Sequence, residues 1–211
     1  MPERSMSTLS TESMWTDDKL VLASSNQGKL REFSKLFSDF GTTVIPQSDL
    51  HVESPEETGL SFIENALLKA RHASAVTELP ALADDSGLVI PALGGAPGLY
   101  SARFAGGNAS DQENLTLLLD RMKDLTGVNR RGHYICALAL VRHAADPDPI
   151  VVIGRWHGQI IDTPRGEGGF GYDPIFLPDG LRQTAAELDS ETKNQQSHRG
   201  LAVIELRSLL S

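Results

Sequence analysis

Two long apolar runs in the second half of the chain constrain its fold most strongly. They are "HYICALALVRH", which starts at His133, and "PIVVIGRWHGQII", which starts at Pro149. Both are rich in β-branched and aromatic residues, and the "AADPDP" segment between them favours a turn. The pattern therefore predicts an antiparallel hairpin of two long strands.

A strand followed by a helix is predicted near the start. "KLVLAS" (19–24) is apolar and ends in turn-forming residues, and apolar residues recur at helical spacing after Lys29. Asn26 can cap this helix, and "TTVIP" (42–46) predicts a second strand. Together with the hairpin, this order favours the α/β class, with a mixed sheet flanked by helices.

Further helices are predicted from capping-box patterns. "SFIE" at Ser61 opens one helix, which presents Asn65 and Lys69 on a single face, and "SDQE" at Ser110 opens another. The final segment, "DSETKNQQSHRGLAVIELRSLL", also ends in a helical pattern.

The "ADDSG" stretch places Asp84 and Asp85 in an otherwise apolar run, where we expect the strand to break. A Mg²⁺ ion would compensate such carboxylates, and an Asx-type turn explains them equally well. Glu53, Glu56 and Glu57 in the preceding acidic loop offer a second metal carboxylate, although such acids are more often solvated.

The opening "SSNQGK" lacks the glycine spacing of a P-loop. Taken alone, the stretch is more typical of a capped turn than of a phosphate site. A helix N-terminus with Lys29 in its first turn nevertheless suits an anion.

The glycine-rich "GGFGYDP" is compatible with two roles for Phe170, stacking on a flat base or packing into the core of a tight hairpin. "KNQQSHRG" adds Lys193, Ser197, His198 and Arg199 as hydrogen-bond donors for carbonyl or phosphate oxygens.

Composition limits the partners. The net charge of −9 disfavours a broad grip on nucleic acid, and no apolar run approaches the ~18 residues of a membrane span. The single cysteine, Cys136, cannot form an internal disulfide, which indicates a cytoplasmic protein.

Residues 1–18 are predicted to be a disordered extension, and residues 19–211 a single domain of two lobes, because no linker divides them.

In this order, six motifs closely resemble the inosine triphosphate pyrophosphatase family, in its bacterial branch acting on dITP and XTP. The resemblance covers about residues 19–210 and rests on "SSNQGK", "EETGLSFIENALLKA", "ADDSGL", "GGAPGLYSARFAG", "GGFGYDPIF" and "SHRGLA". It implies a long twisted mixed sheet with two lobes around a nucleotide-binding cleft, and usually a homodimer. The segment "GGAPGLYSARF" is expected at the dimer interface or at the edge of the cleft. The implied reaction is Mg²⁺-dependent hydrolysis of ITP, dITP or XTP to the monophosphate and pyrophosphate, which removes these nucleotides from the pool.

The resemblance also implies roles for individual residues. The triphosphate would be bound by Ser24, Ser25, Asn26, Gln27, Gly28, Lys29 and Lys69, with Ser86 as a further substrate contact. Asp85 would be the essential carboxylate, binding the metal and orienting water, with Glu57 as the second metal ligand and Asp84 as a less certain neighbour. The base would be held by Phe170, Gly171, Tyr172, Asp173, Lys193, His198 and Arg199.

Two other functions remain open at this point. One is a sensor that binds inosine or xanthine nucleotides without cleaving them, and the other is a related pyrophosphatase for modified pyrimidine nucleotides. One departure from the family pattern is Ser24-Ser25, where a Thr-Gly pair is frequent.

Overall fold

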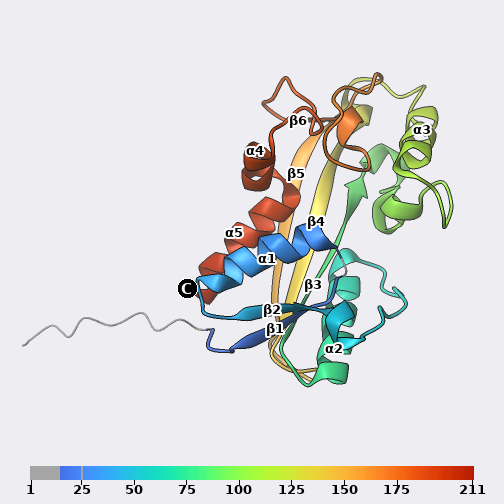
Figure 1. The fold of residues 1–211 in the computed structure, drawn as a ribbon. Helices are drawn as coiled ribbons and strands as arrows, with labels where there is room; N and C mark the ends of the chain where they lie inside the picture. Colours follow the sequence, from blue (N-terminus) through green and yellow to red (C-terminus); the bar gives the residue numbers. More distant parts are fainter. Residues whose placement is uncertain (1–14, 25) are drawn as a thin grey trace, which may run out of the picture.

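A computed structural model describes residues 15–24 and 26–211. Ser25, which the resemblance assigns to the triphosphate, and residues 1–14 of the expected extension lie outside the described residues. Figure 1 shows one long twisted sheet that runs through the whole molecule and carries helices on both sides.

The sheet has six strands in the order β2-β1-β3-β4-β5-β6 (Figure 1). Their bounds are Lys19–Leu22 (β1), Thr43–Pro46 (β2), Ala81–Val89 (β3), Arg131–Val141 (β4), Ile150–Ile160 (β5) and Phe176–Pro178 (β6). β2, β1 and β3 pair in parallel, whereas β3 to β6 pair antiparallel. The predicted hairpin is β4–β5, and the prediction of a mixed α/β sheet is confirmed.

The helices are α1 (Gln27–Ser38), α2 (Phe62–Thr77), α3 (Asp111–Arg121), α4 (Ser190–Gln196) and α5 (His198–Leu210). Short 3₁₀ turns include η3 (Gly98–Arg103). The predicted caps are confirmed: the side chains of Asn26, Ser61 and Ser110 accept backbone N–H bonds at the starts of α1, α2 and α3.

Different helices cover the two faces of the sheet where β1, β3 and β4 lie side by side. On one face, Phe33 and Phe37 of α1 and Leu206 of α5 pack on leucines of β1, β3 and β4. On the other face, alanines of α2 lie against alanines of β3 and β4, and their small side chains allow close packing. A third cluster, which includes Leu118 of α3, fills the upper part of the molecule.

The expected break in β3 at Asp84 and Asp85 is wrong. β3 runs unbroken from Ala81 to Val89, because β4 continues the hydrogen-bonded ladder past both aspartates, with Asp84 opposite Leu138 and Asp85 opposite Ala137. Side chains alternate along a strand, so the two neighbouring carboxylates point to opposite faces of the sheet.

Part of the expected N-terminal extension is packed against the domain. Trp15 is only 3% exposed, meets the edge of the Phe37 ring and donates its indole N–H to Thr42 Oγ1 at 2.8 Å. The folded part of the chain therefore begins no later than Trp15.

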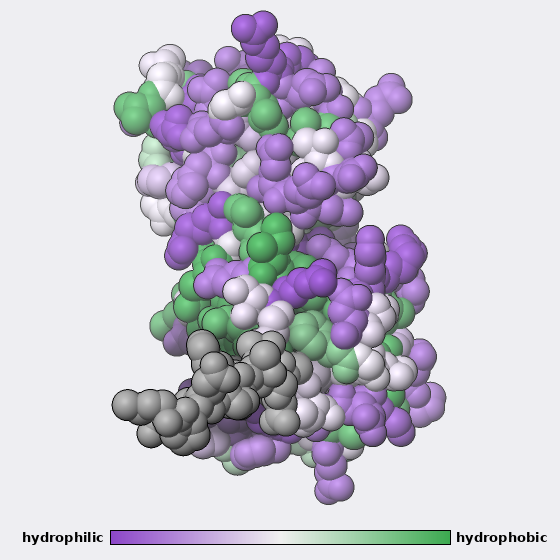
Figure 2. Space-filling model, turned by 90° about the vertical axis from the view of Figure 1, so that its left-hand side faces the viewer, coloured by the Kyte–Doolittle hydropathy of each residue, from purple (hydrophilic) through white to green (hydrophobic). Residues whose placement is uncertain are grey.

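The molecule narrows between an upper and a lower part, and Figure 2 shows hydrophobic surface gathered across this waist. α5, on the same side of the molecule, carries the exposed apolar side chains Leu201, Ile204 and Leu209. Within the described residues, no helix is long and apolar enough to cross a membrane.

Candidate functional site

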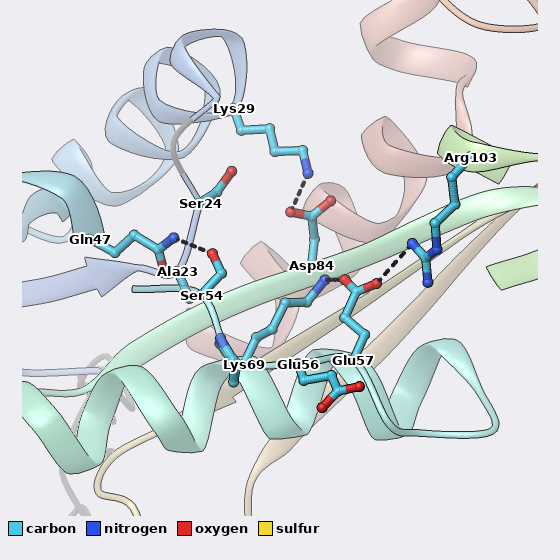
Figure 3. A pocket seen from close by; sticks show the side chains of 11 residues that line it. Ala23, Ser24, Lys29, Gln47, Ser54, Glu56, Glu57, Lys69, Asp84 and Arg103 are labelled. Carbon is cyan, nitrogen blue, oxygen red and sulfur yellow. Dashed lines mark hydrogen bonds and ion pairs between the residues drawn. The ribbon is translucent and has the colours of Figure 1, made fainter. Parts of the chain in front are cut away.

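A charged cleft opens where β1 ends and β3 runs on. β1 stops at Leu22, so the side of β3 that pairs with β1 has no strand beside it at Asp84. A cavity of about 640 Å³ lies there. β1 lies between β2 and β3, so the strand order reverses at this point of the sheet. The carboxyl ends of parallel strands at such a reversal are common ligand sites. The cavity is lined by Ala23, Ser24, Lys29, Gln47, Ser54, Pro55, Glu56, Glu57, Lys69, Asp84 and Arg103 (Figure 3).

Asp84 faces α1 and α5 and is almost fully buried. Lys29 Nζ lies 2.7 Å from its Oδ1, and an Arg199 nitrogen lies 3.9 Å from its Oδ2. Burial opposes ionisation of this carboxyl, but Lys29 and Arg199 outweigh it and lower the pKa of Asp84 to about 2. Asp84 is therefore a fixed negative charge that holds a cation from each helix.

Asp85 faces α2 on the opposite side of the sheet. Lys69 Nζ bridges Asp85 Oδ1 at 3.1 Å and Glu57 Oε1 at 2.9 Å, and Asn65 donates to Asp85 Oδ2 at 3.2 Å. The predicted common face of Asn65 and Lys69 is thus confirmed. Burial raises the pKa of Asp85, and the nearby Glu57 carboxylate adds to the rise, although Lys69 opposes it.

Arg103 of η3 is a cleft residue that we did not identify from the sequence. Its guanidinium lies 3.5 Å from Glu57 Oε2 (Figure 3) and 5.2 Å from the centre of the Tyr100 ring. Burial opposes ionisation of Glu57, but Lys69 and Arg103 together bring its pKa below the usual value. Its segment, "GGAPGLYSARF", is expected at the interface or the cleft edge, but no local pattern singles out the arginine within it.

The cleft fits a magnesium ion by its donor chemistry. Glu57 and Asp85 converge on the same lysine amine, so their carboxylates lie close together. Among residues 15–24 and 26–211, no group of three histidines, cysteines or acids is placed to hold a metal. Two carboxylates still suit Mg²⁺, which keeps several waters and takes its remaining ligands from substrate phosphates. Of the loop acids, Glu53 is exposed and Glu56 points away from the cleft centre (Figure 3).

The described residues of the turn before α1 differ in how they lie relative to the cleft. Ser24 and Lys29 line the cleft. Asn26 uses its side-chain oxygen to accept the N–H groups of Gly28 and Lys29, at 2.8 and 3.1 Å, and so places Lys29. Gln27 is exposed, and Gly28 lines a separate groove between α1 and α5.

Two smaller cavities meet at Phe170, above the cleft. Phe170, His198 and Arg199 line both the first, of about 110 Å³, and the second, of about 390 Å³. The first is also lined by Ser86, Gly171 and Tyr172, and the second by Asp173 and Lys193. Phe170 is 57% exposed, so the alternative that its ring fills a core is wrong.

Charged contacts organise the Phe170 turn. The buried Asp173 accepts the Phe170 N–H at 2.8 Å and pairs with Lys193 at 2.6 Å. The same lysine amine lies 5.1 Å from the centre of the Phe170 ring, a cation–π distance. Tyr172 is buried and donates its hydroxyl to Ser101 O at 2.8 Å, so it supports the turn from below.

His198 is 7% exposed and stacks on Tyr134, with ring centres 4.8 Å apart. Burial, reinforced by the neighbouring Arg199 charge, lowers the pKa of His198 to about 3, so the imidazole is neutral near pH 7. His198 Nδ1 and Arg199 Nε are buried without a hydrogen-bond partner among the described residues. Unpaired buried polar atoms are costly, so this wall suits a polar ligand.

Comparisons with known proteins show which family the chain resembles. A model of the Ham1 family matches residues 20–209. The chain is 57% identical to a dITP/XTP pyrophosphatase of Pectobacterium atrosepticum and 56% identical to one of Escherichia coli, each over 88% of this chain and 94% of that protein.

Solved structures resemble the chain along most of its length. A HAM1 protein from Coxiella burnetii superposes with a TM-score of 0.88 at 47% identity, covering 91% of this chain and 98% of that one. A nucleoside-triphosphatase / dITP/XTP pyrophosphatase from Mycobacterium abscessus gives a TM-score of 0.77 at 43% identity, over 89% and 98% of the two chains.

Proposed function

The chain belongs to the Ham1 family, and from this premise we propose that it hydrolyses deaminated purine nucleoside triphosphates to the monophosphate and pyrophosphate. ITP, dITP and XTP are the proposed substrates, and the bond broken is the α–β phosphoanhydride. Such an enzyme removes these nucleotides before they enter nucleic acid.

The observation that carries the proposal is a charged cleft joined to an aromatic pocket by one residue. Arg199 contacts Asp84 in the cleft and lines both cavities beside Phe170. A nucleotide has the same two-part chemistry, with an anionic chain at one end and a flat polar ring at the other. The base would lie against Phe170, and the triphosphate would extend into the cleft.

Three cations of the cleft would bind phosphate oxygens. Lys29, Lys69 and Arg103 come from α1, α2 and η3, and each now pairs with a carboxylate. A triphosphate brings competing negative charge, and the planar guanidinium of Arg103 suits two phosphate oxygens at once. These residues would neutralise the charge that builds up on the departing pyrophosphate.

Glu57 and Asp85 would hold Mg²⁺, which supplies charge neutralisation and lowers the pKa of a bound water. We assign Asp85 to metal binding and to orienting the attacking water, because a metal-bound carboxylate is a poor base. Asn65, which donates to Asp85 Oδ2, fixes the direction of that carboxylate. Asp84 would hold no metal and would instead position Lys29 and Arg199.

The proposed base pocket would favour 6-oxo purines. Lys193 and Arg199 can only donate hydrogen bonds, so they suit the 6-oxo oxygen of hypoxanthine or xanthine and leave a 6-amino group unmatched. An unsatisfied buried donor costs about 1–3 kcal/mol, and two such losses give discrimination of about a hundredfold or more.

We further propose a cytoplasmic homodimer. The lone Cys136 is buried and free, as suits a reducing compartment. Tyr100, within the "GGAPGLYSARF" segment, is an exposed aromatic side chain of the kind enriched at protein interfaces. Light scattering coupled to size-exclusion chromatography measures the mass directly.

The test is product identification with dITP, XTP, ATP and dGTP in the presence of Mg²⁺. We expect pyrophosphate and the monophosphate from dITP and XTP. Orthophosphate as the product would contradict the proposed bond cleavage, and binding of dITP without any release would favour a sensor.

A further inference from the structure

The turn that carries Phe170 has little conformational restriction of its own, because glycines flank the aromatic residue. Phe170 lies between Gly169 and Gly171, whose φ angles of 77° and 60° lie in the left-handed region that favours glycine. At Gly169 a Cβ would also lie 2.2 Å from Asp173 Oδ2, so the Asp173 carboxylate would have to shift. Two such glycines leave the ring between them with much conformational freedom, so its position depends on outside restraints.

One restraint comes from a distant helix. The N–H of Gly171 donates to Asp111 Oδ2 at 2.7 Å, across 60 residues of sequence. The other ties of the turn use Asp173, which is shared with Lys193, and Tyr172, which bonds to Ser101. Asp111 is thus the described side chain that holds the C-terminal side of Phe170 directly, and it also lines the smaller cavity.

Asp111 is the first residue of α3, a helix that is well anchored to the rest of the fold. α3 starts with a reciprocal capping box of Ser110 and Glu113, and its Leu118 is fully buried in the upper core. Asn114 accepts the Ala105 N–H at 2.8 Å and donates to Ala102 O at 3.2 Å, which ties α3 to the segment after η3. In the first turn of a helix a carboxylate is favoured, so Asp111 is well suited to a charge-assisted hydrogen bond.

We propose that Asp111 is a positioning residue for base recognition: it anchors the Gly169–Phe170–Gly171 turn so that the Phe170 ring is already in place when the purine enters. This inference rests on the proposed function of the same site. Asp111 acts through Phe170, so its loss should weaken binding of the base and leave the phosphate cleft unchanged.

The experiment compares Asp111→Ala with Asp111→Asn, which keeps a side-chain oxygen acceptor. For Asp111→Ala we expect KM for dITP and Kd for dIMP to rise about tenfold, with kcat within about twofold of wild type. Asp111→Asn should restore both to within about threefold. Binding of inorganic pyrophosphate, followed by calorimetry, should be the same in all three proteins. Amide exchange at Gly171 should accelerate only in Asp111→Ala, while β4 amides keep their protection.

Glu113→Ala is the matched control, because it weakens the cap of the same helix without removing the Asp111–Gly171 bond. Equal rises in KM for Asp111→Ala and Glu113→Ala would overturn the inference and leave only a role in the stability of α3. A wild type that cleaves dITP, with Asp111→Ala unchanged in KM and Kd, would overturn this inference alone. A wild type that neither binds dIMP nor cleaves dITP would overturn the proposed function together with it.

Discussion

Replacing His198 by glutamine should remove a pH dependence of stability that the buried imidazole imposes. The pKa of this group is lowered from 6.5 to about 3 by burial and by the Arg199 charge. Between these values the unfolded chain binds a proton that the folded protein does not, so the free energy of unfolding falls as the pH drops below the unfolded pKa. Between about pH 7 and about pH 5, this one group lowers the free energy of unfolding by about 2 kcal/mol.

The assay is urea denaturation of wild type and His198→Gln at these two pH values. The wild type should lose about 2 kcal/mol more than the variant on acidification. His143→Gln changes an exposed histidine and should behave like wild type. The range stops at about pH 5 because the pKa values of Asp85 and Glu32 are raised by burial, and their protonation has the opposite effect. Equal losses in wild type and His198→Gln would refute the neutral buried imidazole.

Four further substitutions test the cleft and its surroundings. Asp85→Asn should abolish pyrophosphate release with little change in the thermal midpoint. Asp84→Asn should lower the free energy of unfolding by about 3 kcal/mol, because it leaves Lys29 and Arg199 without their negative partner. A pyrophosphate assay and thermal denaturation distinguish the two variants. Arg103→Gln should raise KM for dITP while changing stability by less than about 1 kcal/mol, and an unchanged KM would remove Arg103 from the phosphate site. Gly154→Ala places a Cβ 1.8 Å from the His198 carbonyl oxygen, so calorimetry should show weaker dIMP binding and denaturation a loss of about 1–3 kcal/mol.

Features set by neighbouring residues could be predicted from the sequence. The β4–β5 hairpin follows from two apolar runs around a turn, and the start of α1 follows from the capping oxygen of Asn26. The common face of Asn65 and Lys69 follows from helical spacing, and both side chains do meet Asp85.

Features set by distant pairing could not be predicted in the same way. The "ADDSG" stretch looks like a break until β4 is known to pair along it, and only then does the strand alternation send Asp84 and Asp85 to opposite faces. No local pattern singles out Arg103 or Asp111, because their partners, Glu57 and Gly171, lie 46 and 60 residues away in the sequence.

The family resemblance supplied the site residues that spacing alone left open, such as Phe170 and His198. The structure brings these two together at the wall of shared cavities. Ser25 and residues 1–14 lie outside the described residues, so the assignments made for them stay predictions.

The most direct test of the account is the ratio of kcat/KM for dITP to that for dATP under the same Mg²⁺ concentration. The two nucleotides share the triphosphate and the sugar and differ at position 6 of the purine, so the ratio isolates the base pocket. The account predicts a preference for dITP of about a hundredfold or more, with pyrophosphate as the product. A ratio near one would contradict it.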